Sequence, residues 1–119
     1  MQRDLNLVRE ILKAVEASPD HLGTGLPSIE GHDRRVVAHH VWLLRQAGYL
    51  HSIDQTTTDG KDFAFIHLTW AGHEFLDSLR SDASWRKVLE SVRRAGGSLS
   101  FDLIKEIGIS AAKEALRLP

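Results

Sequence analysis

A helix that ends at a glycine and runs directly into a strand constrains the fold of this chain more than any other stretch. Val37, Val41 and Leu44 recur at helical spacing, which predicts a helix with one apolar face. Gly48 follows where a helix end favours a residue with positive φ, so we expect the helix to end there. Further along, a second strand leads through Thr69, a suitable helix N-cap, into a new helix.

The segment between these two helices has the pattern of a β-hairpin. The dipeptide Asp59-Gly60 favours a tight turn, and polarity alternates on both sides of it. On the second strand Phe63, Phe65 and His67 alternate with aliphatic residues, which predicts one aromatic and one aliphatic face. Helix, strand, turn, strand and helix in this order are typical of the second half of a winged helix-turn-helix.

The sequence predicts one long helix in residues 1–32 and no second long helix there. An apolar stripe and the candidate N-cap Asp4 predict a helix over residues 3–17. Residues 18–32 are rich in Pro, Gly and Asp, and we expect a short extended piece around residues 26–29 instead of a long helix. The helix-turn-helix is therefore predicted to be shortened.

After the hairpin, from residue 69 onward, the sequence predicts only helices. The helices are expected at residues 69–80, at residues 82–95, and from a cap at Ser98 or Ser100 towards the C-terminus. Trp70 and Trp85 stand on their apolar stripes and are predicted to be mostly buried. The expected fold is mainly α with a small β-hairpin: a winged helix-turn-helix domain over residues 1–80 and a C-terminal helical extension over residues 81–119.

Composition bounds the functions open to the chain. Its 119 residues contain no cysteine, which excludes disulfides and thiolate zinc sites. No apolar run approaches the roughly 20 residues that span a bilayer, and the polar first residues do not resemble a secretory signal. We expect a cytoplasmic protein without membrane association. With no phosphate loop, nucleophile elbow or metal-ligand spacing, we expect neither an enzyme nor a cofactor.

The overall charge gives no support to simple nucleic-acid binding, because a basic face is its usual signature. The chain carries 15 basic and 16 acidic residues, net −1. Residues 1–80 carry 8 basic and 11 acidic residues, net −3, while residues 81–119 carry 7 and 5, net +2. A DNA-binding surface would therefore have to come from local clustering of basic residues.

The helix before Gly48 offers such a cluster on the side turned away from its apolar stripe, a side that also includes Ala38. The candidate DNA-binding residues are Arg34, Arg35, His39, Trp42 and Arg45, with Lys61 on the hairpin. Arginine can bridge phosphates or bind guanine edges, and an outward tryptophan often marks a contact. Two alternatives stay open: Trp42 covers the N-terminal segment while the arginines are solvated, or the same surface and the last helix bind a protein. The acids of the hairpin tip argue against its docking on DNA.

The last helix carries apolar residues around much of its circumference, which predicts a second packing partner. The candidate partner interface is Phe101, Ile104, Ile107 and Leu116. A two-fold homodimer is the commonest solution for such a surface, and it would place two recognition helices on one side for a palindromic site in double-stranded DNA.

Several stretches of the chain resemble a known family. Residues 3–12, 40–48 and 68–77, together with Trp85 and the Gly96-Gly97-Ser98 run, are similar to the YjcQ-like proteins, a bacterial and phage-borne family of unknown function. The Leu-Thr-Trp-x-Gly-His-Glu-Phe-Leu-Asp run is the most specific part. More loosely, the chain resembles dimeric winged-helix repressors of the PadR and MarR kind. These resemblances imply a winged helix followed by extra helices, and a regulator of phage or mobile-element origin.

Overall fold

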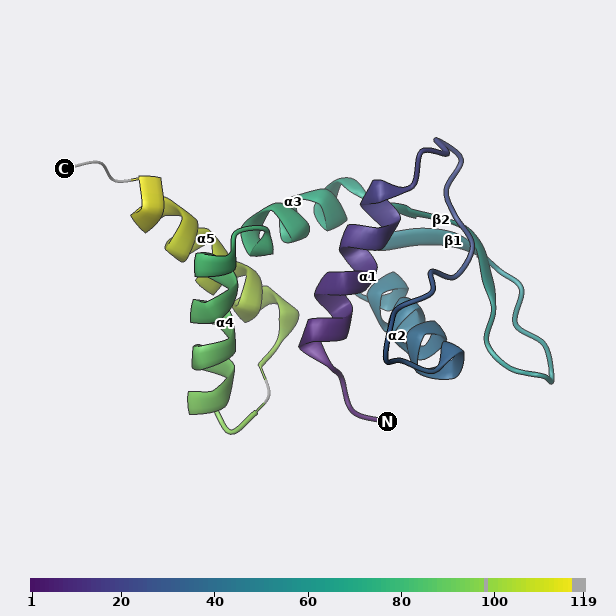
Figure 1. Ribbon diagram of the computed structural model, residues 1–119, viewed down its shortest axis with the longest axis horizontal. Helices are drawn as coiled ribbons and strands as arrows, with labels where there is room; N and C mark the ends of the chain where they lie inside the picture. Colours follow the sequence, from purple (N-terminus) through teal and green to yellow (C-terminus); the bar gives the residue numbers. More distant parts are fainter. Residues whose placement is uncertain (98, 117–119) are drawn as a thin grey trace. The chain divides into compact units, whose positions relative to one another are not determined.

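The computed structural model describes residues 1–97 and 99–116, and it is mainly helical, as the sequence predicts (Figure 1). Its elements are α1 (Leu5–Ala17), α2 (Arg34–Gln46), β1 (Leu50–Asp54), β2 (Phe63–Leu68), α3 (Trp70–Leu79), α4 (Asp82–Arg94) and α5 (Phe101–Leu116). The two strands form one antiparallel sheet. Among the described residues, no helix combines the length and the apolar character that crossing a bilayer requires.

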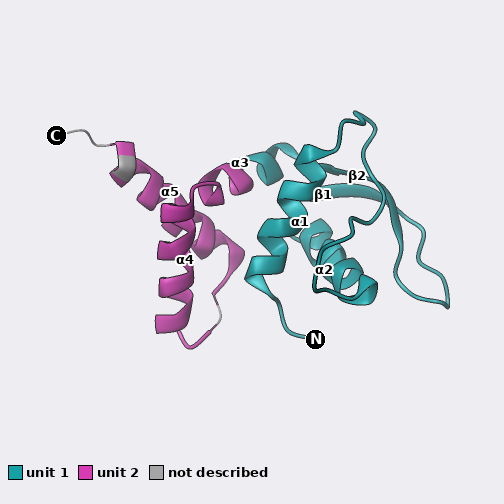
Figure 2. Cartoon of the chain, viewed as in Figure 1, with its two compact units in different colours: residues 1–73 teal, residues 74–119 magenta. Residues whose placement is uncertain are grey.

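The chain divides into two compact units, residues 1–73 and residues 74–119 (Figure 2). The division falls inside α3, earlier than the 80/81 boundary expected from the sequence. The first unit contains α1, α2 and the hairpin, and the second contains α4, α5 and most of α3.

In the first unit, α1 and α2 are joined by a buried histidine. His40 is fully buried, and its Nε2 accepts a hydrogen bond from the Asp4 N–H at 2.9 Å. Its Nδ1 lies 2.8 Å from the Val36 carbonyl oxygen, so the ring donates there. Asp4 also caps α1 by accepting from the Leu7 N–H, as predicted. The apolar core around this link consists of Leu7, Val8, Ile11, Leu12, Val15, Val37, Val41, Leu44, Leu50, Phe63 and Ile66.

The end of α2 and the start of α3 are tied together at one point. Gly48 has a φ of 84°, and the Tyr49 N–H donates to the Leu44 carbonyl at 3.0 Å, which closes α2 with the predicted glycine motif. The Thr69 hydroxyl donates to the Gly48 carbonyl at 2.6 Å and accepts from the Gly72 N–H at 2.9 Å. Thr69 is therefore the predicted N-cap of α3 and also an anchor for the end of α2.

The hairpin is irregular at one position. Its register pairs His51 with His67 but Ile53 with Ala64, so β2 carries an extra residue at this point. Phe65 lies in this bulge with a φ of 54° and is exposed, whereas Phe63 is buried. The prediction of one aromatic face on β2 is therefore wrong, because the bulge interrupts the alternation.

The segment between α1 and α2 contains no helix, as predicted from its prolines and glycines. Residues 26–29, where the sequence predicts a short extended piece, contain no strand, and the contact of this segment with the sheet lies at Thr24. The Thr24 N–H donates to the Ile66 carbonyl at 2.9 Å, and the Ile66 N–H donates back at 2.7 Å. Thr24 thus adds a single antiparallel bridge to the edge of β2.

The second unit packs α4 and α5 with the C-terminal part of α3. Its buried apolar side chains are Phe75, Leu76, Leu79, Trp85, Val88, Val92, Phe101, Ile104 and Ala111. Gly108 permits a close approach of helices, since a Cβ there would lie 2.5 Å from the Ser78 carbonyl oxygen. Ser100 caps α5 by accepting from the Leu103 N–H, while the alternative cap, Ser98, lies outside the described residues.

One of the two predicted core tryptophans is buried and the other is not. Trp85 is 7% exposed, which confirms the prediction, but Trp70 is 80% exposed. At about 100° per residue, Trp70 lies about 180° around the helix from Leu79. The buried stripe of α3 starts at Gly72 and continues through Phe75. The prediction for Trp70 is therefore wrong, because it grouped residues that face opposite sides of the helix.

Candidate nucleic-acid interface

All six predicted DNA-contacting residues lie on one surface of the first unit, formed by α2 and the loop of the hairpin. We call it the α2–hairpin surface; it consists of Asp33, Arg34, Arg35, His39, Trp42, Arg45, Asp54, Asp59, Lys61 and Asp62. The side chain of Asp33 caps α2 by accepting from the Arg35 N–H at 2.8 Å. Helical periodicity places Val37 and Val41 on the face towards the core and leaves Arg34 and Arg35 exposed to solvent. Ala38, which the sequence placed on the outer side, is buried.

The arginines of this surface already have acidic neighbours. The Arg34 guanidinium donates to the Asp62 carboxylate at 3.0 Å, and both side chains are exposed. Arg35 lies 3.8 Å from the capping carboxylate of Asp33. Exposed pairs of this kind contribute about 0–1 kcal/mol to stability, so they hold the side chains only weakly.

Trp42 lies under a cation from the hairpin and is half-buried. The Lys61 ammonium is 4.7 Å from the centre of the indole ring, a cation–π distance, and the His39 ring centre is 5.6 Å away. The sequence left open whether Trp42 covers the N-terminal segment or forms part of a surface that binds DNA or a protein. In the structure it contacts the hairpin, and this contact joins the loop to α2.

Arg45 is the most enclosed of the basic residues, with 26% of its side chain exposed. Its guanidinium lies 4.9 Å above the buried Phe63 ring and 3.8 Å from the Asp54 carboxylate, and it donates to the Ser52 carbonyl at 3.4 Å. Arg45 thus links α2 to both strands. We therefore interpret it first as a structural bridge, with part of its charge still accessible.

Two ionisable groups on this surface have shifted pKa values. Burial lowers the pKa of His39, and the nearby His40, N-terminal amine and Lys61 lower it further. Hydrogen bonds from Thr56 lower the pKa of the Asp54 carboxyl. The lowered pKa values favour the neutral form of His39 and the ionised form of Asp54, whose carboxylate lies 3.8 Å from Arg45.

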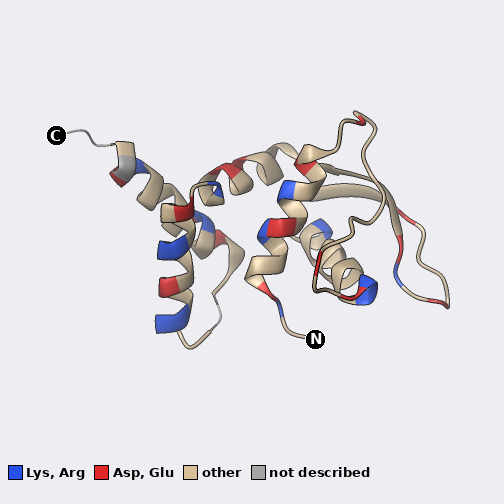
Figure 3. Ribbon diagram, in the orientation of Figure 1, with Lys and Arg blue, Asp and Glu red and all other residues tan. Residues whose placement is uncertain are grey.

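The surface as a whole carries both signs of charge. Figure 3 shows basic residues on α2 and both acidic and basic residues on the hairpin loop. A depression of about 330 Å³ lies between the start of α2 and the loop, and its lining includes Arg34, Arg35 and Lys61 together with Asp59 and Asp62. Within the described residues, no group of three or more His, Asp or Glu side chains is placed to hold a metal ion.

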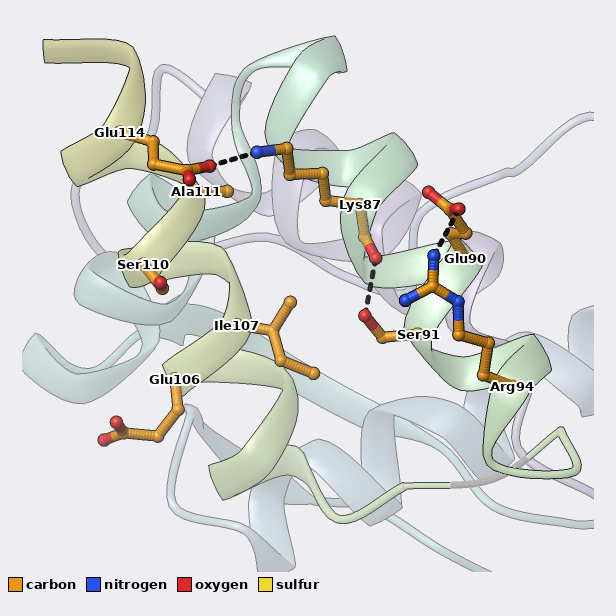
Figure 4. Close-up of a pocket in the computed structure, with 9 residues that line it drawn as sticks. All are labelled: Lys87, Glu90, Ser91, Arg94, Glu106, Ile107, Ser110, Ala111 and Glu114. Atoms are coloured by element: carbon orange, nitrogen blue, oxygen red, sulfur yellow. Dashed lines mark hydrogen bonds and ion pairs between the residues drawn. The ribbon is translucent and has the colours of Figure 1, made fainter. Parts of the chain in front are cut away.

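The predicted partner interface does not stay together as one exposed patch. Phe101 and Ile104 are buried inside the second unit, because they form the stripe of α5 that packs on its own neighbours. Ile107 is half-buried and lines a groove of about 520 Å³ between α4 and α5, and Leu116 is 79% exposed. Figure 4 shows this groove, whose rim includes the ion pair between Lys87 and Glu114.

Sequence reasoning missed the part played by Asp54 and Asp62. Both acids were counted only as a charge that disfavours DNA, whereas the structure places each beside an arginine of α2. The hairpin has as many acids as α2 has arginines, and this equality was a signal for such pairing. Which acid pairs with which arginine depends on the path of the hairpin.

Comparison with known proteins places the chain among proteins of unknown function. Residues 2–98 match the family described as "Hypothetical protein (DUF2513)". A protein of Haemophilus influenzae, described as an uncharacterized protein, is 32% identical over 117 residues, covering 98% of this chain and 99% of that protein. No solved structure matches the chain. A family of unknown function is thus confirmed, while the YjcQ-like relationship stays a prediction.

Proposed function

The chain belongs to the family described as "Hypothetical protein (DUF2513)", and we propose that this member is a cytoplasmic, winged-helix DNA-binding regulator. In this proposal α2 is the recognition helix and the β1–β2 hairpin is the wing. The YjcQ-like, phage-borne origin inferred from the sequence is part of the same proposal.

The observation that supports it best is the gathering of the six candidate residues on the α2–hairpin surface. Arg34 and Arg35 lie in the first turn of α2, exposed and at the end of the helix that contacts base edges in helix-turn-helix proteins. Lys61 reaches the same surface from the hairpin. Side chains that can bind phosphates and guanine are therefore available from two neighbouring elements.

Binding to mixed-sequence double-stranded DNA across a salt series tests the proposal. We expect binding at low salt that weakens steeply as salt rises, because phosphate contacts release counterions. No binding even at low salt would contradict the proposal. It would favour the second candidate function, a protein-interaction module.

The second candidate is supported by the charge balance and by an exposed aromatic side chain. The α2–hairpin surface carries Arg34, Arg35, Arg45 and Lys61 against Asp33, Asp54, Asp59 and Asp62, net zero. Trp70, at the start of α3, is 80% exposed. Large exposed aromatic groups and low net charge are typical of protein-binding surfaces.

Replacing Arg34 or Arg35 by alanine is expected to weaken DNA binding by about 1–3 kcal/mol if the side chain binds a base, or to lower the salt slope by about one unit if it binds phosphate. The free energy of unfolding should change little, because both side chains are exposed. Fluorescence anisotropy with labelled DNA measures the effect. Lys13→Ala, an exposed position on α1, removes the same charge elsewhere and should leave binding almost unchanged. Unchanged affinity in both arginine variants would refute the role of α2.

A homodimer is the second part of the proposal, and the outer stripe of α5 is its best candidate surface. This stripe, Ile109, Ala112 and Leu116, lines a groove of about 300 Å³ against α3. Glu74 and Asp77 border the groove on α3, and Lys105 and Lys113 border it on α5. Lys105 lies 3.7 Å from Glu74 of the same chain, so the contact between two copies would rest on the apolar stripe.

Light scattering at micromolar concentration is expected to give a dimer mass for the full chain and a monomer mass for Leu116→Glu. Leu116 is 79% exposed, so the substitution should act on association and not on folding. The matched control is Leu103→Glu on the same helix, at a position 47% exposed and outside the stripe, which should remain a dimer. A monomer mass for the unchanged chain would end this part of the proposal.

A further inference from the structure

We propose that Asp62 in the hairpin loop and Asp54 at the end of β1 limit the affinity of the α2–hairpin surface for DNA of arbitrary sequence. This inference rests on the proposed DNA-binding function and concerns how the same surface is controlled. Each acid holds an arginine of α2: Asp62 holds Arg34 at 3.0 Å, and Asp54 lies 3.8 Å from Arg45.

The α2–hairpin surface carries equal numbers of positive and negative charges. Binding to DNA without sequence preference depends almost entirely on phosphate neutralisation by Lys and Arg. A surface with four cations and four carboxylates gains little from an arbitrary phosphate, since each phosphate that approaches an arginine also approaches its acid. The lowered pKa of Asp54 keeps its negative charge in place over a wider pH range.

The ion pair between Arg34 and Asp62 is weak. Both side chains are exposed, 65% and 41%, so water and salt screen their attraction. Separating Arg34 from Asp62 costs free energy. A DNA site whose bases form hydrogen bonds with the released arginine offsets this cost. An arbitrary site offers only phosphate, and the carboxylate competes with it. The acid therefore lowers the affinity for arbitrary DNA, while base contacts at a preferred site offset the same cost.

The hairpin holds Asp62 in its position near Arg34. Lys61 over the Trp42 ring lies next to Asp62 in the chain, so the aromatic contact keeps the carboxylate near Arg34. Asp62 also accepts from the Phe63 N–H at 2.9 Å, where β2 begins. The position of the acid is thus determined by the hairpin, and the pairing does not depend on a freely moving side chain.

The chain offers a matched pair of variants for the test. Asp62→Asn removes the charge that faces Arg34 and keeps an oxygen for the Phe63 N–H. Asp59→Asn makes the same change in net charge on the same loop, where the Asp59 N–H binds the Thr57 hydroxyl. The probe is a mixed-sequence duplex of about two helical turns, titrated by anisotropy at several salt concentrations.

We expect Asp62→Asn to bind the mixed-sequence duplex about tenfold more tightly than the unchanged chain at low salt, and to steepen the salt slope by up to about one unit. Asp59→Asn should increase affinity much less. In an Arg34→Ala background, Asp62→Asn should lose its advantage over Asp59→Asn, because there is no arginine to free. Thermal unfolding checks that the variants remain folded.

The outcomes separate this inference from the function on which it rests. If the unchanged chain binds DNA but Asp62→Asn and Asp59→Asn have equal effects, the inference is overturned and the DNA-binding function stands. If neither the unchanged chain nor any variant binds at low salt, the proposed function fails and the inference fails with it. A gain by Asp62→Asn that persists in the Arg34→Ala background would also overturn the pairing argument.

Discussion

Replacing Trp85 by alanine is expected to lower the free energy of unfolding by about 3–5 kcal/mol, the range for a buried large aromatic side chain. Trp85 is 7% exposed and lies on the same stripe of α4 as Val88 and Val92. An alanine leaves a cavity that the packed helices of the second unit fill only partly. Urea unfolding followed by circular dichroism measures the loss, with the midpoint and slope analysed together.

Trp70 provides the matched control, because the same substitution removes the same side chain from an exposed position. At 80% exposure, Trp70→Ala should cost far less than Trp85→Ala. Equal losses for the two variants would contradict the burial difference between α3 and α4. A small loss for Trp85→Ala would mean that the second unit contributes little to the measured unfolding.

Replacing Gly72 by alanine is expected to destabilise the first unit, although alanine is the better helix former by about 1 kcal/mol. A Cβ at this position would lie 2.0 Å from the Tyr49 carbonyl oxygen, far inside contact distance. The loss should reach the upper end of the roughly 1–3 kcal/mol typical of overpacking, because the neighbour is backbone and cannot rotate away. Thermal unfolding measures the effect.

Gly25→Ala is the control for this substitution. An added Cβ at Gly25 meets no atom within 4 Å, and its φ is not in the left-handed region. This change should be neutral or slightly stabilising, since it restricts the unfolded chain. If Gly72→Ala were as stable as Gly25→Ala, the close contact between α3 and the segment after α2 would be wrong.

The local features of the fold were predictable because each depends on residues close together in the chain. Asp4, Asp33 and Thr69 act as N-caps, and Gly48 closes α2 with positive φ. Caps and helix ends depend on side chains within about four residues of the backbone groups they satisfy. The absence of a helix between α1 and α2 follows in the same way from prolines and glycines.

Features that depend on long-range contacts needed the tertiary structure. The bulge at Phe65 separates two aromatic residues that simple alternation had placed together. Phe101 and Ile104 are buried because their face of α5 packs within the second unit. The sequence did not show which face this would be, because apolar residues lie around much of the helix. A count of apolar residues on a helix gives its total apolar area, but the packing partners decide which face is buried.

The candidate site shows the same division. The sequence by itself determined which side of α2 carries the arginines, because 3.6 residues per turn fix which residues share a face. It did not determine what those side chains meet. Only the tertiary structure places Asp62 beside Arg34 and Lys61 over Trp42. The residues of these pairs are 28 and 19 positions apart, and the path of the hairpin loop between them depends on the packing of the whole first unit.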